Sequence, residues 1–364
     1  MKYVIVVVFF LLVYSAKAQT ITVDSIASLE SKITESSGLL YINGKLFTHT
    51  DSGNEPAIYE LDAYTGKVIR TTRLKNTKNK DWEDITKDEE YIYVGDFGNN
   101  QGARTDLKIQ KFKIIDLLNS SLDTITADTI SFHYSDQVDF TPSNFTTNFD
   151  AEAFVSMGDS LYIFTKNWGD FKTNIYSCPK EKGNYTLNKI GSANTLGMVT
   201  GATRNEELNL VVLCGYSFTG AFLVKLSNVN PNPFQNMQAE RFTISPAGSI
   251  QVEGICYAEN NKYFLSSEAF QGAPALLHKI EDQQLTRIKS LNKKSFLFFP
   301  NPSSDLVEIN SPSFQSLKIL DQRGRIVFES KEKKVDISSL SKGFYTLQVV
   351  LTNDAISNSP LLKK

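Results

Sequence analysis

Cysteine and histidine are scarce in this chain: its 364 residues contain three of each. An odd number of cysteines cannot all pair internally, and each lies in an apolar, strand-like run, so buried thiols are expected rather than a disulfide framework. The C-x-x-C, H-E-x-x-H, G-x-S-x-G and phosphate-loop motifs are absent from the sequence. These absences exclude the commonest zinc, serine-hydrolase and nucleotide-binding signatures.

Excess positive charge is also absent. Lys and Arg number 38 against 40 Asp and Glu, which gives a net charge of -2, and no basic stripe runs along the sequence. Nucleic acids and anionic membranes are therefore not expected partners. After residue 13 the sequence has no apolar run long enough to predict a transmembrane segment.

The first 18 residues predict a secretory signal peptide. Lys2 supplies the positive start, Val4–Val13 is an uninterrupted apolar run, and Ala16-Lys17-Ala18 forms an A-x-A cleavage site. The apolar run is shorter than the roughly 20 residues that span a bilayer. The protein is therefore expected to be exported, with Gln19 as its new N-terminus.

The C-terminal residues 293–364 predict a small β-sandwich. LVEI, SLKILD, RIVFES and GFYTLQVVL are short apolar or alternating runs typical of strands, and DQRGR provides a glycine turn between two of them. The segment FPNP at 299–302 is too rich in proline for a strand interior, so it marks the start of the domain.

These motifs also carry a family resemblance. The order FPNP-S-x-x-L-x-I, LKILDQRGRIV, VDISSLSKGFYTLQV and a terminal LLKK resembles the type A C-terminal sorting domain of type IX secretion. The resemblance implies that the type IX machinery carries the protein across the outer membrane. It further implies release into the medium or anchoring at the cell surface, where an extracellular ligand is expected.

The middle of the chain, residues 19–292, contains an internal repeat. Five segments begin with an acidic or glycine-containing motif and continue as four short strands. Their openings are TESSGLLYI, DWEDITKD, FDAEAFVSM, MVTGATRN and QVEGICYAE. The expected fourth strands are VIRTTRL, ITADTISFHY, TLNKIGS, ERFTIS and LTRIKSL, and only KIIDLLNSS suggests a helical turn.

The spacing of the repeat predicts a β-propeller. The equivalent positions Glu35, Glu83, Glu152, Gly201 and Glu253 are 48, 69, 49 and 52 residues apart. Four strands in roughly 45–50 residues is the size of a propeller blade. We therefore expect an all-β chain with a five-bladed propeller, or a six-bladed one if the long step hides a degenerate blade. The N-terminal run ITVDSIASL is available to complete the last blade.

The same repeat predicts a ring of side chains. The first strand of each propeller blade lines the central channel, so the opening motifs converge near one mouth. A second ring is expected where the second strands end, at Asp51, Asp96, Asn167, Tyr216 and Glu268.

Converging carboxylates repel one another, so they are protonated, accept backbone N–H bonds, or surround a cation. Calcium takes six to eight oxygen ligands, often carboxylates. The candidate metal ligands, with Ca²⁺ as the candidate ion, are Glu35, Glu83, Glu152, Glu253, Asp51 and Asp96. The competing interpretation is that each glutamate caps its own blade by bonding the backbone of its neighbour.

Other side chains near the predicted mouth have two interpretations each. His49 is either a general base or a packed strand residue, and Arg104 binds an anion or pairs with a carboxylate. Trp82 and Trp168 either stack on a ligand or fill space between blades.

The E-x-G and D-A-E-A-F phrases are similar to exported propellers of the phytase-like and SdiA-regulated type, in which acidic residues line the channel. Two functions remain open. One is an exported binding or scaffold module with an acidic, calcium-binding channel face. The other is a metal-dependent hydrolase of phosphate or carboxylic esters at the same site. No nucleophile–base pair can be named in the sequence, which favours the binding module.

Overall fold

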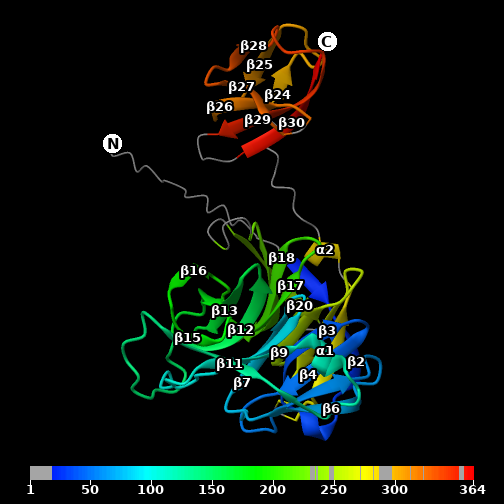
Figure 1. The fold of residues 1–364 in the computed structure, drawn as a ribbon, viewed down its shortest axis with the longest axis vertical. Helices are drawn as coiled ribbons and strands as arrows, with labels where there is room; N and C mark the ends of the chain where they lie inside the picture. The colour runs from blue at the N-terminus through cyan, green and yellow to red at the C-terminus, as the bar shows by residue number, and fades with distance from the viewer. Residues whose placement is uncertain are drawn as a thin grey trace, which may run out of the picture. The chain divides into compact units, whose positions relative to one another are not determined.

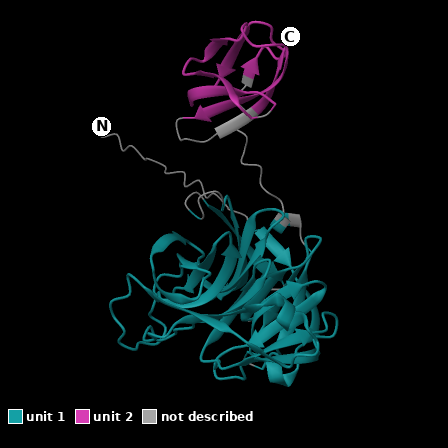
Figure 2. Cartoon of the chain, in the orientation of Figure 1, with its two compact units in different colours: residues 1–287 teal, residues 288–364 magenta. Residues whose placement is uncertain are grey.

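The computed structural model describes residues 19–229, 234, 237–245, 250–270, 272–281, 283–286, 297–311, 313–322, 324–351 and 356–364. The predicted signal peptide lies outside them. The chain divides into two compact units, residues 1–287 and 288–364 (Figure 2). Among the helices of the described residues, none has the length and apolar character needed to cross a bilayer.

The described part of the first unit contains five sheets (Figure 1). The first sheet consists of β3 (Ser36–Ile42), β4 (Lys45–Thr50), β5 (Ala57–Leu61), β6 (Val68–Lys75) and β10 (Thr124–Thr126). The second consists of β7 (Trp82–Lys87), β8 (Tyr91–Asp96), β9 (Lys108–Lys113), β11 (Asp128–Tyr134) and β15 (Gly183–Leu187). The third consists of β12 (Asp150–Met157), β13 (Ser160–Lys166), β14 (Thr173–Pro179) and β16 (Lys189–Ala193).

The last two sheets include strands from the N-terminus. The fourth consists of β17 (Met198–Asn205), β18 (Leu210–Ser217), β19 (Gly220–Ser227), β20 (Gln238–Ser245) and β1 (Gln19–Thr22). The fifth consists of β21 (Val252–Tyr257), β22 (Tyr263–Ser267), β23 (Leu276–Ile280) and β2 (Asp24–Ser28). The helical pieces are η1 (Ser31–Ile33), α1 (Ile114–Leu118) and α2 (Gln283–Thr286).

The five first strands make a closed ring. In order, β3 contacts β7, β7 contacts β12, β12 contacts β17, β17 contacts β21, and β21 contacts β3. Each pair of neighbouring sheets encloses its own apolar cluster, as Phe164, Val199 and Phe222 do between the third and fourth sheets. Because both faces of a sheet are covered, strands such as β12 are buried along their whole length. The prediction of an all-β propeller is confirmed.

One predicted fourth strand, LTRIKSL, is wrong. Leu285 and Thr286 belong to α2, and the rest of the segment lies outside the described residues. Leu285 is fully buried and packs with Ile21 and Ile280, so its apolar character serves the core from a helix. The fourth strand of this sheet is β2, which pairs antiparallel with β23, as the available N-terminal run allowed.

The second unit is a sandwich of two sheets. One consists of β24 (Leu297–Phe299), β25 (Leu306–Asn310) and β28 (Lys334–Asp336). The other consists of β26 (Phe314–Leu320), β27 (Ile326–Ser330), β29 (Gly343–Leu351) and β30 (Ile356–Lys363). Its core includes Val307, Ile319 and Val349, which alternate with exposed or half-buried neighbours, as in the predicted β-sandwich.

Candidate functional site: an acidic cavity at the propeller axis

Every first strand carries one extra residue relative to its partner, at the same place. The register of β7 with β8 shifts between Trp82 and Asp84, and the corresponding shifts in β12 and β21 surround Glu152 and Glu253. The fourth sheet has Thr200 at this position, and the first sheet has its extra residue within Ser37-Gly38. A bulge re-aims the side chain that it carries. The repeat is therefore anchored on a bulge, and the expected equivalents Glu35 and Gly201 lie beside it rather than in it.

Four of the five bulges contribute a residue to the lining of a cavity of about 90 Å³, and Thr200 does not line it. Five of the six predicted metal ligands line it, and Asp96 does not. The full lining consists of Glu35, Ser37, Asp51, Glu83, Asn100, Glu152, Lys166, Tyr216, Glu253 and Glu268. Residues from all five sheets or the loops beside them thus reach one space.

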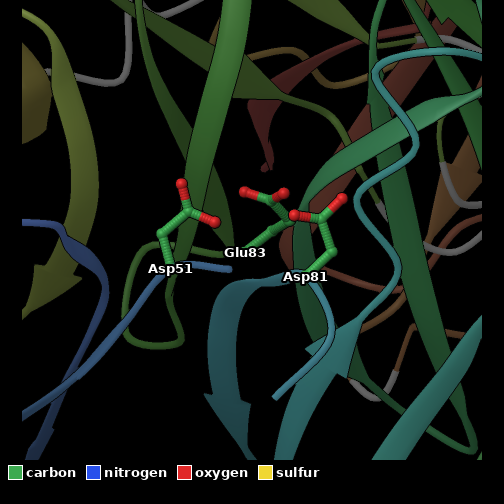
Figure 3. A group of neighbouring side chains, drawn as sticks. All are labelled: Asp51, Asp81 and Glu83. Carbon is green, nitrogen blue, oxygen red and sulfur yellow. The ribbon is translucent and has the colours of Figure 1, made fainter. Parts of the chain in front are cut away.

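Three carboxylates form the tightest group beside this cavity (Figure 3). Asp51 follows β4, Asp81 precedes β7, and Glu83 is the bulged residue of β7. One oxygen from each lies within 4.8 Å of the others. Gly98 makes room for two of them, because a Cβ there would lie 1.9 Å from Glu83 Oε1 and 2.5 Å from Asp81 Oδ2. The sequence prediction missed Asp81, although it stands two residues before Glu83.

Glu83 is buried and lacks hydrogen-bond donors to its carboxylate among the described residues. The residue is 4% exposed. Burial, followed by repulsion from Glu152 and Asp51, raises the pKa of Glu83 well above its usual range. Burial and the charge of Asp51 likewise raise the pKa of Asp81 to about 7. A buried carboxylate without donors is costly unless a proton or a cation satisfies it.

Lys166 is the basic side chain that the sequence prediction missed. It ends β13, and its Nζ lies 3.1 Å from Glu152 Oε1 inside the cavity. Its Nζ also lies 5.0 Å from the centre of the Trp168 ring and 5.4 Å from that of Tyr216. The expected second-ring residue was Asn167, whose side chain instead bonds Thr165 and Asp170. One positive charge thus faces many carboxylates, which leaves the cavity acidic.

Asp96 has a different environment from the one expected. Its carboxylate pairs with Arg104 at 2.9 Å and Lys108 at 3.4 Å, and its Oδ1 accepts the backbone N–H of Asp81. Arg104 is therefore ion-paired, in line with the second of its two interpretations. Asp96 supports Asp81 through the backbone rather than lining the cavity.

The backbone-capping interpretation does not describe the glutamates. The bonds between neighbouring first strands come from other side chains: Ser37 Oγ donates to Glu83 O at 2.5 Å, and Thr200 Oγ1 donates to Val252 O at 2.6 Å. The fully buried Asp84 accepts the backbone N–H groups of Phe154 and Ala202, at 3.0 and 3.1 Å. These contacts leave the bulged glutamates free to face the cavity.

His49 and Trp82 are core residues. His49 is fully buried, packs edge-on against Trp82 at 5.7 Å, and does not line the cavity. Burial lowers the pKa of His49 to about 4, so it is neutral near pH 7. Trp168, by contrast, is half-buried beside Lys166 and donates its Nε1–H to Asp150 at 2.8 Å.

The C-terminal unit identifies how the protein is handled in the cell. Residues 297–361 match the family described as secretion system C-terminal sorting domain. The protein is exported. Its destination is the cell surface or the medium, and the sorting domain is the part that the secretion machinery handles, as its motifs predicted.

The chain is similar to solved structures that share little of its sequence. No curated protein matches the chain. An exo-β-1,3-galactanase of Phanerochaete chrysosporium is 10% identical, with 93% of this chain and 99% of that one covered and a TM-score of 0.45. An α-L-arabinanase of Penicillium chrysogenum is 12% identical, with 94% and 98% covered and a TM-score of 0.42. Similarities at this level say nothing about activity, and the likeness to phytase-like propellers stays a prediction.

Proposed function

We propose that the propeller is an exported binding module that holds one calcium ion between Asp51, Asp81 and Glu83. The observation that carries the proposal is the carboxylate of Glu83, which is buried, aimed at two further carboxylates and without a hydrogen-bond donor among the described residues. A divalent cation would neutralise this repulsion and coordinate the free oxygens together.

The donor set favours a cation that prefers oxygen ligands, such as calcium, over zinc. All three side chains offer oxygen, and the group contains no His or Cys, the usual ligands of zinc. Two oxygens on opposite sides of a calcium ion are roughly 5 Å apart, because each bond is about 2.4 Å long. The observed spread of up to 4.8 Å fits ligands on one such ion. Asn100 and water in the cavity would supply further oxygens.

A metal-dependent hydrolase at the same site is the second candidate. It is favoured by Asp81 and Glu253, since burial raises their pKa to about 7 and about 8, near the range of a general acid at neutral pH. The cavity volume opposes it. About 90 Å³ is well below the roughly 300–1,000 Å³ of typical small-molecule sites, so the cavity admits an ion or a single substrate group.

Calcium titration by calorimetry, with residues 19–364 first treated with EDTA, tests the binding module. We expect one site and a calcium-dependent rise in melting temperature. Glu83→Gln should abolish both, whereas Glu89→Gln, in the exposed turn after β7, should change neither. A melting temperature indifferent to calcium and EDTA would exclude the metal site. Calcium-dependent turnover of p-nitrophenyl phosphate or acetate, lost in Glu253→Gln, would favour the hydrolase.

A further inference from the structure

Exposed aromatic side chains lie in loops next to residues that line the acidic cavity. Phe218 is 91% exposed and Phe145 60% exposed, and each pairs with a second ring. The Phe145 and Trp168 rings lie 4.6 Å apart, and those of Phe171 and Phe218 lie 5.9 Å apart. We call these four residues the aromatic rim.

The rim is continuous with the cavity. Lys166, which lines the cavity, lies against the Trp168 ring, and the backbone N–H of Phe145 donates to the carbonyl of Asn100, another lining residue. On the other side, Phe218 follows the lining residue Tyr216 by two positions in the turn between β18 and β19. A ligand on the rim would therefore lie next to the cavity that the carboxylates line.

The backbone holds these apolar side chains in an unusual conformation. Phe145 has φ of 56°, Phe171 55°, and the neighbouring exposed Leu196 54°. Bulky residues rarely adopt positive φ, and such conformations persist where the surroundings fix them, often at binding sites. The carbonyl of Phe171 is fixed by the N–H of Gly197 and the hydroxyl of Thr195. The loops thus present apolar groups to solvent at a conformational cost.

The charges around the rim select the ligand. The surplus of carboxylates repels polyanions, and Lys166 already occupies the inner faces of the Trp168 and Tyr216 rings, where a cationic ligand would bind. A neutral ligand with apolar faces and hydroxyl edges suits both surfaces. Its faces stack on aromatic rings, and its hydroxyl groups donate to carboxylates. Carbohydrate has this combination.

We propose that the aromatic rim binds a neutral polysaccharide, with sugar rings on the Phe145–Trp168 and Phe171–Phe218 pairs and hydroxyl groups directed into the acidic cavity. This inference names the ligand class of the proposed binding module. Stacking of sugar rings on the aromatic rim does not require a bound ion. Contacts between sugar hydroxyl groups and calcium would depend on the proposed cation site.

Affinity electrophoresis of residues 19–364 tests the inference, with starch, xylan, mannan, galactan, arabinan and a β-1,3-glucan in the gel. At least one neutral polysaccharide should retard the protein. Phe145→Ala/Phe218→Ala should weaken that binding at least tenfold. Tyr64→Ala is the matched control, since Tyr64 is 86% exposed but lines a different pocket, and it should bind as the unchanged chain does.

Three results would overturn the inference: no retardation by any of these polysaccharides, equal retardation of the double variant, or stronger binding to polygalacturonate or polylysine. Calcium titration of the same samples separates the two proposals. Calcium binding without polysaccharide binding would overturn the polysaccharide proposal and leave the cation site standing. Polysaccharide binding that depends on the rim, without calcium binding, would overturn the cation site and leave the polysaccharide proposal standing.

Discussion

Lys166 Nζ and Glu152 Oε1 form an ion pair of 3.1 Å, and their side chains are 7% and 3% exposed. The pair joins the end of β13 to the bulge of β12, within one sheet. Coulombic attraction to Glu152 and other carboxylates raises the pKa of Lys166 well above its usual range despite burial, so the lysine stays charged. The fixed positive charge of Lys166 thus pairs with Glu152, whereas in the Asp51–Asp81–Glu83 group Arg104 lies 3.9 Å from Asp81 and no ion pair reaches Glu83 among the described residues.

Removing one member of this pair should be more harmful than removing both. Lys166→Met leaves Glu152 buried without its partner, and we expect a loss of about 3 kcal/mol in the free energy of unfolding. Lys166→Met/Glu152→Gln should recover part of it. Urea unfolding of the single and double variants measures the coupling, and strictly additive losses would contradict the pairing.

The cation-free protein should become less stable as pH rises. Glu253 and Asp81 have folded-state pKa values of about 8 and about 7, above their ordinary 4.5 and 3.8. Below about pH 4 both states hold the protons, and as pH rises toward 8 the unfolded chain loses them first, which favours unfolding. In EDTA the melting temperature should fall between pH 5 and 8.

Calcium should reverse this trend, because ion binding displaces the protons of its ligands Asp81 and Glu83 and so tightens with rising pH. The check is a series of melting curves from pH 5 to 8, in EDTA and in calcium. Glu253→Gln should reduce the slope in EDTA. A slope that Glu253→Gln leaves unaltered would assign the effect to other groups.

Asp84 should be the most sensitive acidic residue for folding. It is fully buried, and it accepts the backbone N–H groups of Ile85, Phe154 and Ala202, from three first strands. Asp84→Ala would leave these buried N–H groups without an acceptor and should lower the free energy of unfolding by about 3 kcal/mol or more. Asp159→Ala, in the exposed turn between β12 and β13, is the control. Chemical denaturation of both compares them directly.

The N-terminal strands should be required for the propeller. β1 pairs parallel with β20, and its Ile21 is fully buried between the fourth and fifth sheets. Ile21→Asp should cost about 4 kcal/mol, whereas Thr22→Asp, on the exposed face of the same strand, should be nearly neutral. Melting temperatures of the two variants give the test, and equal effects would argue against this closure.

Removal of residues 288–364 should block export across the outer membrane but leave the propeller folded. The second unit has its own core, and residues 297–361 match the sorting-domain family. Fractionation of cells that express the truncated chain should find it in the periplasm, with the melting temperature of the first unit unchanged. Normal delivery of the truncated chain to the cell surface would show that another segment directs export across the outer membrane.

The sequence predicted the propeller well because the opening motif recurs five times, with three of the four spacings between 48 and 52 residues, and because the strands are apolar or alternating. The site was predicted only in part. Side-chain direction along a strand follows from alternation, and a bulge breaks that alternation at one residue. Glu83, Glu152 and Glu253 were found because the recurring opening motif marks the bulged position. Lys166 was passed over for Asn167 because neighbouring strand residues point to opposite faces, and the sequence did not show which of the two faces the cavity.

Two further errors have physical causes. Asp81 and Asp96 are both near Glu83 in the chain, and only the fold shows that Arg104 and Lys108 neutralise Asp96. The segment LTRIKSL has an alternating pattern that suits a strand, but β2 already occupies the position beside β23. Neither long-range ion pairing nor competition for a sheet edge can be judged from local sequence.

The buried Asp84 also determines how the acidic cavity exchanges its contents. Its carboxylate and the close first-strand backbones fill the axis: a Cβ at Gly254 would lie 2.1 Å from Ser37 O. A second pocket of about 340 Å³, lined by Ile85, Ala202 and other residues, shares no lining residue with the cavity. The propeller axis is thus closed on one side of the acidic cavity. A ligand of the cavity would enter and leave on the side of the aromatic rim.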